Sequence, residues 1–133
     1  PGERVGLGSM AFRITIGNKS LLNLGDSLLL ADWEGLRPTV LMLPMGGLGE
    51  NTWTMDVDDA IEAVERIDPE LVIPCHYSVP FLWKKKFAVA DDARFKREVE
   101  ALGKNCRILG AGDVAIVLVW RHWYEESIRR KRI

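Results

Sequence analysis

The sequence predicts an α/β fold built on one mostly parallel β-sheet. Two continuous apolar runs, 39–43 and 71–75, have the length of buried strands. Between them, residues 56–66 carry apolar side chains at helical spacing and acidic residues in the first turn. The order strand–helix–strand places both strands side by side in the sheet.

The N-terminal part predicts a β-hairpin. Residues 10–16 are rich in β-forming side chains, Gly17-Asn18 is a favoured turn dipeptide, and 20–24 is the returning strand. Residues 28–33 follow as one or two helical turns, capped by Asp26 or Ser27. The sheet is therefore expected to be mixed, with an antiparallel edge.

The C-terminal part predicts a second amphipathic helix over 90–102 and a short strand over 107–109. Residues 114–120 form the most continuous β pattern of the chain. Residues 121–133 are expected to be a basic terminal helix or tail, a solvated end or a phosphate-binding patch. Residues 1–133 are expected to form a single domain.

Composition excludes several classes of function. The 133 residues are 47% hydrophobic and carry 18 basic against 19 acidic side chains. A chain with so little net charge has no overall positive field to attract nucleic acid, so we do not expect nucleic acid as a partner. Neither a membrane-spanning run nor a signal peptide is evident. Cys75 and Cys106 are far apart and indicate buried free thiols, which favours the cytoplasm.

Two strand ends present side chains that bind metals. Asp26 follows the returning strand of the hairpin, and His76 follows the run 71–75. A carboxylate can bridge two metal ions, and an imidazole can bind one of them. Alternatively, Asp26 is an ordinary turn or cap residue, and His76 bonds a backbone carbonyl. Two candidate ligands alone do not define a site.

The order of short motifs adds a family resemblance over residues 8–113. The motifs are Leu24-Gly25-Asp26, the segment 43–47 (Leu-Pro-Met-Gly-Gly), Thr54-Met55-Asp56 at a helix start, and the segment 72–77 (Val-Ile-Pro-Cys-His-Tyr). In this order they resemble the C-terminal half of the metallo-β-lactamase superfamily. The nearest likeness is to the branch that includes the L-ascorbate-6-phosphate lactonases.

The resemblance implies a fold, a cofactor and a reaction. The fold would be half of an αββα sandwich, a mixed sheet with helices on one face. Asp26 would bridge two divalent ions and His76 would bind one, with zinc first and manganese or iron as alternatives. Gly46 and Gly47 would lie near the mouth of the site, and Tyr77 behind the ligands or facing substrate. The reaction would be attack of metal-bound hydroxide on an ester, lactone or phosphodiester of a small molecule.

The sequence also departs from the family. The motif His-x-His-x-Asp-His is absent, and the second of two histidines, His122, lies beyond the resemblance and is expected to be an ordinary surface residue. The chain begins at Pro1 without Met, which indicates a processed or truncated protein. We therefore expect this chain alone to be inactive, with the missing ligands supplied by an N-terminal half or by another chain.

The alternative function is a catalytically inactive half-domain that serves as an oligomeric assembly or binding module. Half of a sandwich leaves one sheet face without its partner layer, and such faces drive association. We therefore expect a homo-oligomer, a dimer or larger, or a complex with a complementary N-terminal half. Trp83 and Lys84-Lys85-Lys86 are expected to contact substrate or partner, or to form a solvated loop.

Overall fold

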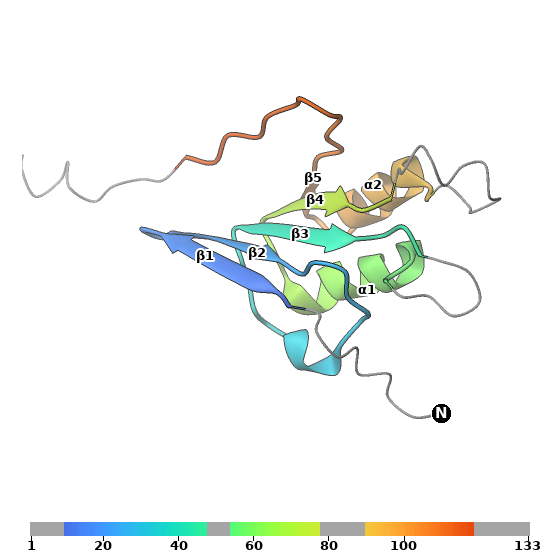
Figure 1. Ribbon diagram of the computed structural model, residues 1–133, viewed down its shortest axis with the longest axis horizontal. Coiled ribbons are helices and arrows are strands. Elements are labelled where there is room, and N and C mark those ends of the chain that lie inside the picture. The colour runs from blue at the N-terminus through green and yellow to red at the C-terminus, as the bar shows by residue number, and fades with distance from the viewer. Residues whose placement is uncertain (1–9, 48–53, 78–89, 119–133) are drawn as a thin grey trace, which may run out of the picture.

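The computed structural model describes residues 10–47, 54–77 and 90–118 of the chain. They contain one five-stranded sheet whose strands follow chain order from β1 to β5 (Figure 1). Two α-helices, α1 and α2, and a short 3-10 helix, η1, complete the described elements. In chain order the bounds are β1 Phe12–Ile16, β2 Lys19–Asn23, η1 Ala31–Trp33, β3 Val40–Pro44, α1 Val57–Ile67, β4 Leu71–Cys75, α2 Asp92–Ala101 and β5 Asn105–Cys106.

The sheet is mixed, as predicted. Strands β1 and β2 form the expected antiparallel hairpin, and Gly17 turns the chain with φ of 59°. Strands β2, β3, β4 and β5 are parallel to their neighbours. The longest parallel pairing joins β3 to β4, from Val40 opposite Leu71 to Pro44 opposite Cys75. The α/β fold class is therefore confirmed.

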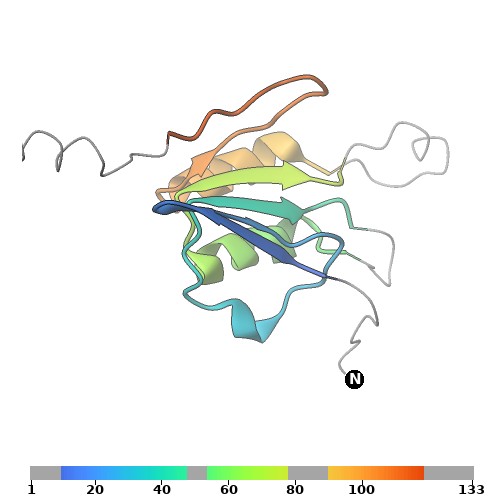
Figure 2. The same cartoon turned by 60° about the vertical axis from the view of Figure 1, so that its left-hand side comes forward.

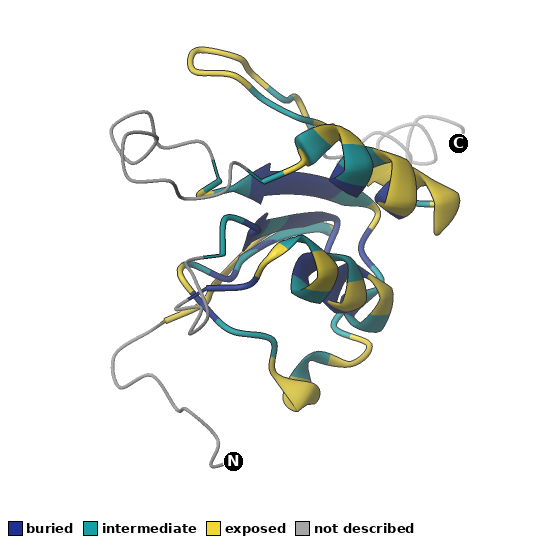
Figure 3. Ribbon diagram, turned by 90° about the vertical axis from the view of Figure 1, so that its right-hand side faces the viewer, coloured by how far each residue is buried: buried dark blue, intermediate teal, exposed yellow. Residues whose placement is uncertain are grey.

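Both helices pack on one face of the sheet. The strand register aligns Leu22, Leu41, Val72 and Cys106 in one row, and all four side chains are buried in the core. Both helices bury their apolar sides in the same core, through Ala60, Ala63, Val64 and Ile67 of α1 and Phe95 and Val99 of α2. Figure 3 shows both helices with exposed residues on their outer sides. The prediction of helices on one face is confirmed.

The other face of the sheet is apolar too. Arg13 of β1 lies opposite Leu22, so Phe12, Ile14 and Ile16 project from the helix-free face. Their exposed fractions are 56%, 56% and 64%. In Figure 2 the strands lie in front of both helices, and β1 forms the edge. A mostly parallel sheet that is apolar on both faces requires a second covering layer.

The helix boundaries follow their caps. The predicted helix 56–66 is α1, with Asp56 as N-cap accepting a hydrogen bond from the Asp59 amide at 3.0 Å. It ends at Asp68, which adopts φ of 59° and donates its amide to the Val64 carbonyl. Asp91 caps α2 in the same way through the Arg94 amide at 2.8 Å. The apolar spacing in the sequence therefore predicted both helix starts to within two residues, and the structure identifies the caps.

Three local predictions differ from the structure: the cap of the helical turn within 28–33, the bounds of the strand at 107–109 and the strand at 114–120. Residues 28–33 contain only η1, whose N-cap is Leu30 without a side-chain cap, so neither Asp26 nor Ser27 caps it. The last strand is β5 rather than 107–109, although the Arg107 amide extends the ladder to the Val72 carbonyl at 2.9 Å.

The β pattern of 114–120 forms no strand in its described part, 114–118. Val114, Ile116 and Leu118 are 77%, 77% and 69% exposed there. A strand needs the backbone of a neighbouring strand, and the described residues provide none for this segment. Its alternating apolar side chains, like those of β1, therefore lack a covering layer among the described residues.

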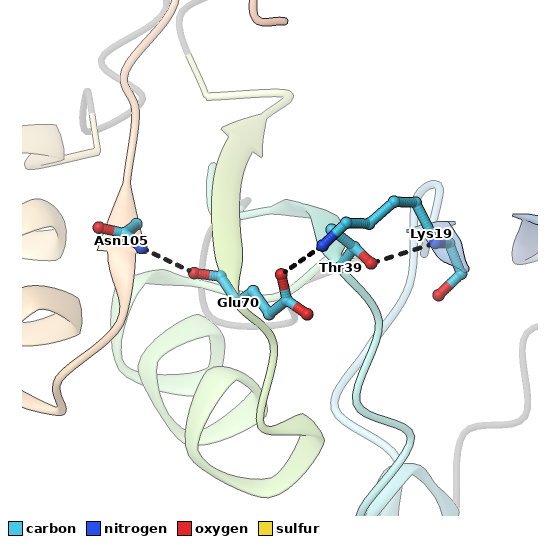
Figure 4. A network of polar contacts seen from close by, with 5 residues as sticks. Lys19, Thr39, Glu70 and Asn105 are labelled. Carbon is cyan, nitrogen blue, oxygen red and sulfur yellow. Dashed lines mark hydrogen bonds and ion pairs between the residues drawn. The ribbon is translucent and has the colours of Figure 1, made fainter. Parts of the chain in front are cut away.

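The amino ends of the parallel strands are joined by polar contacts (Figure 4). Lys19 Nζ forms an ion pair with Glu70 at 3.2 Å, and Asn105 Nδ2 donates to the Glu70 carbonyl at 3.2 Å. The hydroxyl of Thr39 accepts from the Ser20 amide at 3.2 Å. These contacts link β2, β3, β4 and β5 at their amino ends, and none of them involves the carboxyl ends of these strands.

The described part of the chain contains no helix long and apolar enough to cross a membrane. Several predictions fall outside the described residues: the terminal segment 121–133, His122, Trp83 and the lysines 84–86. The single-domain prediction for 1–133 stays a prediction.

Candidate metal-binding site

The predicted site residues meet at the carboxyl ends of β2, β3 and β4. Asp26 follows β2, Gly46 and Gly47 follow β3, and His76 follows β4. In open parallel sheets, ligands bind outside the carboxyl ends of the strands, because successive loops converge there. The site therefore lies at the end of the sheet opposite the polar contacts of Figure 4.

Asp26 is presented by a tight turn. The Asn23 side chain accepts a hydrogen bond from the Gly25 amide at 2.9 Å, and Gly25 adopts φ of 59°. A Cβ on Gly25 would lie 2.9 Å from the Met10 carbonyl oxygen, so glycine suits this position for two reasons. The Asp26 side chain is 69% exposed and lies above the strand ends.

His76 faces Asp26. Its Nδ1 lies 3.5 Å from Asp26 Oδ1, and its side chain is 39% exposed. The separation is longer than a usual charge-assisted hydrogen bond, so the two groups are neighbours rather than a tightly bonded pair. His76 adopts φ of 52°, which is rare for a residue other than glycine. The left-handed backbone ends β4 and turns the chain at the site.

Gly46 lies against the backbone of His76. A Cβ at position 46 would lie 2.2 Å from the His76 carbonyl oxygen and 3.3 Å from the Tyr77 Cα. One residue earlier, the Met45 amide donates to the Cys75 carbonyl at 3.3 Å. The segments after β3 and β4 therefore run in close contact, and only glycine permits that contact at position 46.

Gly47 connects the site to the segment before α1. Its amide donates to the Met55 carbonyl at 3.1 Å, and the Met55 amide donates to the Ser27 carbonyl at 2.9 Å. The residues after β2 and β3 and those before α1 thus form one hydrogen-bonded frame. Gly46 lies against the His76 backbone and Gly47 belongs to this frame, while their place at the mouth of a metal site stays a prediction.

Two hydroxyl groups of this frame were missed by the sequence analysis. Ser27 Oγ and Thr54 Oγ1 are buried and have no hydrogen-bond partner among the residues that the structure describes; their residues are 9% and 2% exposed. Buried hydroxyls are normally paired, since leaving one unpaired costs about 1–3 kcal/mol. Their position in the motif strings Gly-Asp-Ser and Thr-Met-Asp was the one available signal.

Tyr77 and Cys75 flank His76. Tyr77 packs against the hydrophobic core, and burial, followed by the charge of Asp92, raises the pKa of its hydroxyl. Burial is also the main cause that raises the pKa of the Cys75 thiol, and the charge of Asp26 adds to it. Both groups are therefore neutral at pH 7. Cys75 is a free, partly buried thiol, in agreement with the sequence analysis.

The Asp26–His76 pair fits part of a metal site. A carboxylate oxygen and an imidazole nitrogen are both donors that zinc, iron and manganese accept. Among residues 10–47, 54–77 and 90–118, however, no group of three or more His, Cys, Asp or Glu side chains is placed to hold a metal. The pair supplies two donors, and a catalytic zinc site usually takes three from protein.

Comparison with known proteins identifies the fold and its relatives. A family model described as a beta-lactamase superfamily domain matches residues 1–76, which include both Asp26 and His76. A UPF0173 metal-dependent hydrolase of Nanoarchaeum equitans is 32% identical over 116 residues, covering 84% of this chain and 50% of the relative. One of Carboxydothermus hydrogenoformans is 32% identical over 110 residues, covering 80% and 45%. The chain thus spans half or less of the length of these relatives.

Comparison with solved structures finds the same fold. The metallo hydrolase Igni18 of Ignicoccus hospitalis is similar with a TM-score of 0.60 and 31% identity, over 72% of this chain and 40% of that one. The metallo-β-lactamase fold protein YhfI of Bacillus subtilis shares the fold, with a TM-score of 0.55, 14% identity and coverage of 77% and 41%. The chain belongs to the beta-lactamase superfamily, with a domain of the metallo-β-lactamase type.

Proposed function

We propose that this chain is the C-terminal portion of a metal-dependent hydrolase, in which Asp26 and His76 are metal ligands. The observation that carries the proposal is the 3.5 Å approach of their Oδ1 and Nδ1 atoms at the carboxyl ends of β2 and β4. Support comes from relatives that are named metal-dependent hydrolases and are about twice as long. The remaining ligands would come from an N-terminal half or from another chain.

The metal would be a divalent ion, with zinc first and manganese or iron as alternatives. Imidazole and carboxylate donors together suit all three, so the residues fit each of them. When bound, such an ion supplies Lewis acidity toward water and toward a substrate oxygen. In this chain Asp26 and His76 would hold the ion. The hydrogen-bonded frame of Gly46 and Gly47 would fix the position of the two donor atoms relative to each other.

The substrate would be a small ester, lactone or phosphodiester, and the enzyme would act in the cytoplasm. The L-ascorbate-6-phosphate lactonase-like branch is our specific suggestion, on the motif order around Asp26 and His76. Gly46 and Gly47 follow β3 and would lie at the rim of the site, where a substrate would approach. Tyr77 follows His76 but packs on the core, so we assign it to support of the ligand rather than to substrate contact.

The test of this function is hydrolysis by the protein that includes the coding sequence upstream of Pro1. We expect a His-x-His-x-Asp-His motif there, and cleavage of an activated ester, a lactone or bis(p-nitrophenyl) phosphate that stops with a chelator. Asp26→Asn and His76→Asn should each abolish it. Asp32→Asn, which alters an exposed acid in η1, is the control. Chelator-resistant hydrolysis, or full activity in either site variant, would contradict the proposal.

A second function is favoured by the exposed apolar strands. If no upstream half exists, the helix-free face with Phe12, Ile14 and Ile16 must be covered in another way. A second copy of the chain offers the same apolar face and could cover it in a symmetric dimer. The chain would then be an inactive assembly module.

Light scattering of the purified 133-residue chain tests the assembly function. We expect a dimer or larger, which Ile14→Glu should dissociate because it places a charge in the apolar face. Leu30→Glu is a matched control, since Leu30 is 49% exposed next to η1 and outside that face. A monomeric wild-type chain with no bound N-terminal fragment would rule the assembly function out.

A further inference from the structure

The backbone of His76 is held in an unfavourable conformation at the candidate site. Its φ of 52° lies in the left-handed region, where a Cβ crowds the following carbonyl. Non-glycine residues persist in such conformations when surrounding contacts impose them, and they gather at functional sites. The contact that imposes this one can be identified.

Gly46 provides that contact. The closest atoms to a Cβ at position 46 are backbone atoms of the segment after β4: the His76 carbonyl oxygen at 2.2 Å, the His76 carbonyl carbon at 3.3 Å and the Tyr77 Cα at 3.3 Å. Backbone atoms cannot rotate aside as a flexible side chain can. Pairing of Pro44 with Cys75 and the Met45–Cys75 hydrogen bond fix both segments just before this point. Any side chain at 46 must therefore displace His76.

We propose that Gly46 is a positioning residue that sets the separation of His76 from Asp26. Its missing side chain lets the His76 carbonyl approach, and the left-handed turn that results directs the imidazole toward Asp26, at 3.5 Å. The ligand role of His76 rests on the proposed function, whereas the positioning role of Gly46 rests on backbone geometry alone. An experiment can therefore contradict the ligand role of His76 without contradicting the positioning role of Gly46, and the reverse.

The test compares Gly46→Ala with Gly35→Ala. A Cβ at Gly35 meets nothing within 4 Å, although Gly35 has a positive φ, of 70°, that Gly46 does not have. Both variants add one methyl group to a glycine, and only Gly35→Ala also strains a left-handed backbone, so a change at His76 that occurs in Gly46→Ala alone comes from the contact with His76. The readout is the imidazole ¹H–¹³C spectrum, which contains two histidines and is assigned with His76→Asn.

We expect Gly46→Ala to shift the His76 resonances while Gly35→Ala leaves them in place. Added Mn²⁺ should broaden the wild-type His76 signal, and at least tenfold more Mn²⁺ should be needed in Gly46→Ala. Unchanged His76 resonances in folded Gly46→Ala would overturn the positioning role. If Mn²⁺ does not broaden wild-type His76, the ligand role fails, and the resonance shift still decides the positioning role.

A second pair of variants decides the matter if Gly46→Ala does not fold. His76→Gly and His76→Ala both remove the imidazole, but only glycine adopts the left-handed conformation freely. If Gly46 imposes that conformation, the ratio of folded to unfolded chain should be roughly 5–30 times higher for His76→Gly. Equal stability of these two variants in urea would overturn the proposal.

Discussion

Asp26 and His76 approach to 3.5 Å between Oδ1 and Nδ1, although a whole strand, β3, runs between the strands that present them. The loops after β2 and β4 therefore bend toward each other across the end of β3. Gly25 and His76 both adopt left-handed backbones at these bends. The candidate site thus depends on two turns and one glycine contact, at Gly46, rather than on the strands themselves.

The buried hydroxyl of Thr54 gives the first prediction. Thr54→Val removes a hydroxyl that has no hydrogen-bond partner within the described ranges and keeps the side-chain shape, so we expect the free energy of unfolding to rise by about 1 kcal/mol or to stay unchanged. Thr39→Val is the matched control, because the Thr39 hydroxyl accepts from the Ser20 amide. It should lose about 1 kcal/mol in urea titration. A loss of that size in Thr54→Val would show that its hydroxyl is paired in solution.

The N-cap of α1 gives the second prediction. Asp56→Ala should destabilise the chain by about 1 kcal/mol, because the Asp59 amide loses its acceptor. Asp56→Asn should retain most of the stability, since an amide oxygen also caps a helix. Thermal unfolding by circular dichroism measures both. Equal losses in the two variants would mean that charge, not the cap bond, is what matters.

The lowered pKa of Asp68 leads us to expect that the free energy of unfolding falls in acid. Its hydrogen bond and ion pair with Lys104 lower the pKa of the carboxyl below 3.8, and Arg37, at 3.1 Å, adds to the effect. The charged form is thus favoured by folding. Its contribution is full above the unfolded pKa, near 3.8, and is lost as pH falls through the lower folded pKa.

Asp68→Asn isolates this dependence, because asparagine also tolerates the left-handed backbone at φ of 59°. Urea midpoints of wild type and variant should differ at pH 6 and converge below pH 3.8. A difference that is constant over this range would contradict the assignment.

The raised pKa of Cys106 leads us to expect that the free energy of unfolding falls in alkali. Burial in the core raises the pKa of its thiol to about 11, from 9.0. The neutral thiol is favoured by folding, so stability is full below pH 9 and declines as pH rises from 9 toward 11. Cys106→Ala should show a shallower decline over this range in urea titrations, with Cys75 kept in both proteins. Parallel declines would indicate that Cys106 does not titrate as described.

Local sequence signals predicted most of the described fold. The hairpin, β3, α1, β4 and α2 were each indicated by an apolar run or period, a turn dipeptide or acidic residues at a helix start. The errors have a common cause. Residues 114–118 have a strand pattern that requires a neighbouring strand, and a pattern cannot state where that neighbour is. The pattern at 28–33 lacked a side-chain cap and produced only η1.

The sequence proposed residues for the candidate site, but it did not predict their geometry. Motif order indicated Asp26, His76, Gly46 and Gly47. The left-handed backbone of His76 could not be predicted, because it results from long-range contact with the segment after β3.

The burial of the Ser27 and Thr54 hydroxyls likewise could not be predicted from the motif strings in which they stand. Their burial depends on how the segments after β2 and before α1 meet, through the Met55–Ser27 hydrogen bond.

Metal content tests the central claim most directly. The protein that includes the sequence upstream of Pro1 should be purified without added metal, and its zinc, manganese and iron measured by elemental analysis. We predict bound metal in the wild type and in Asp32→Asn, and loss of metal in both Asp26→Ala and His76→Ala. Metal retained at the wild-type level in either of these two variants would contradict the assignment of that residue as a ligand.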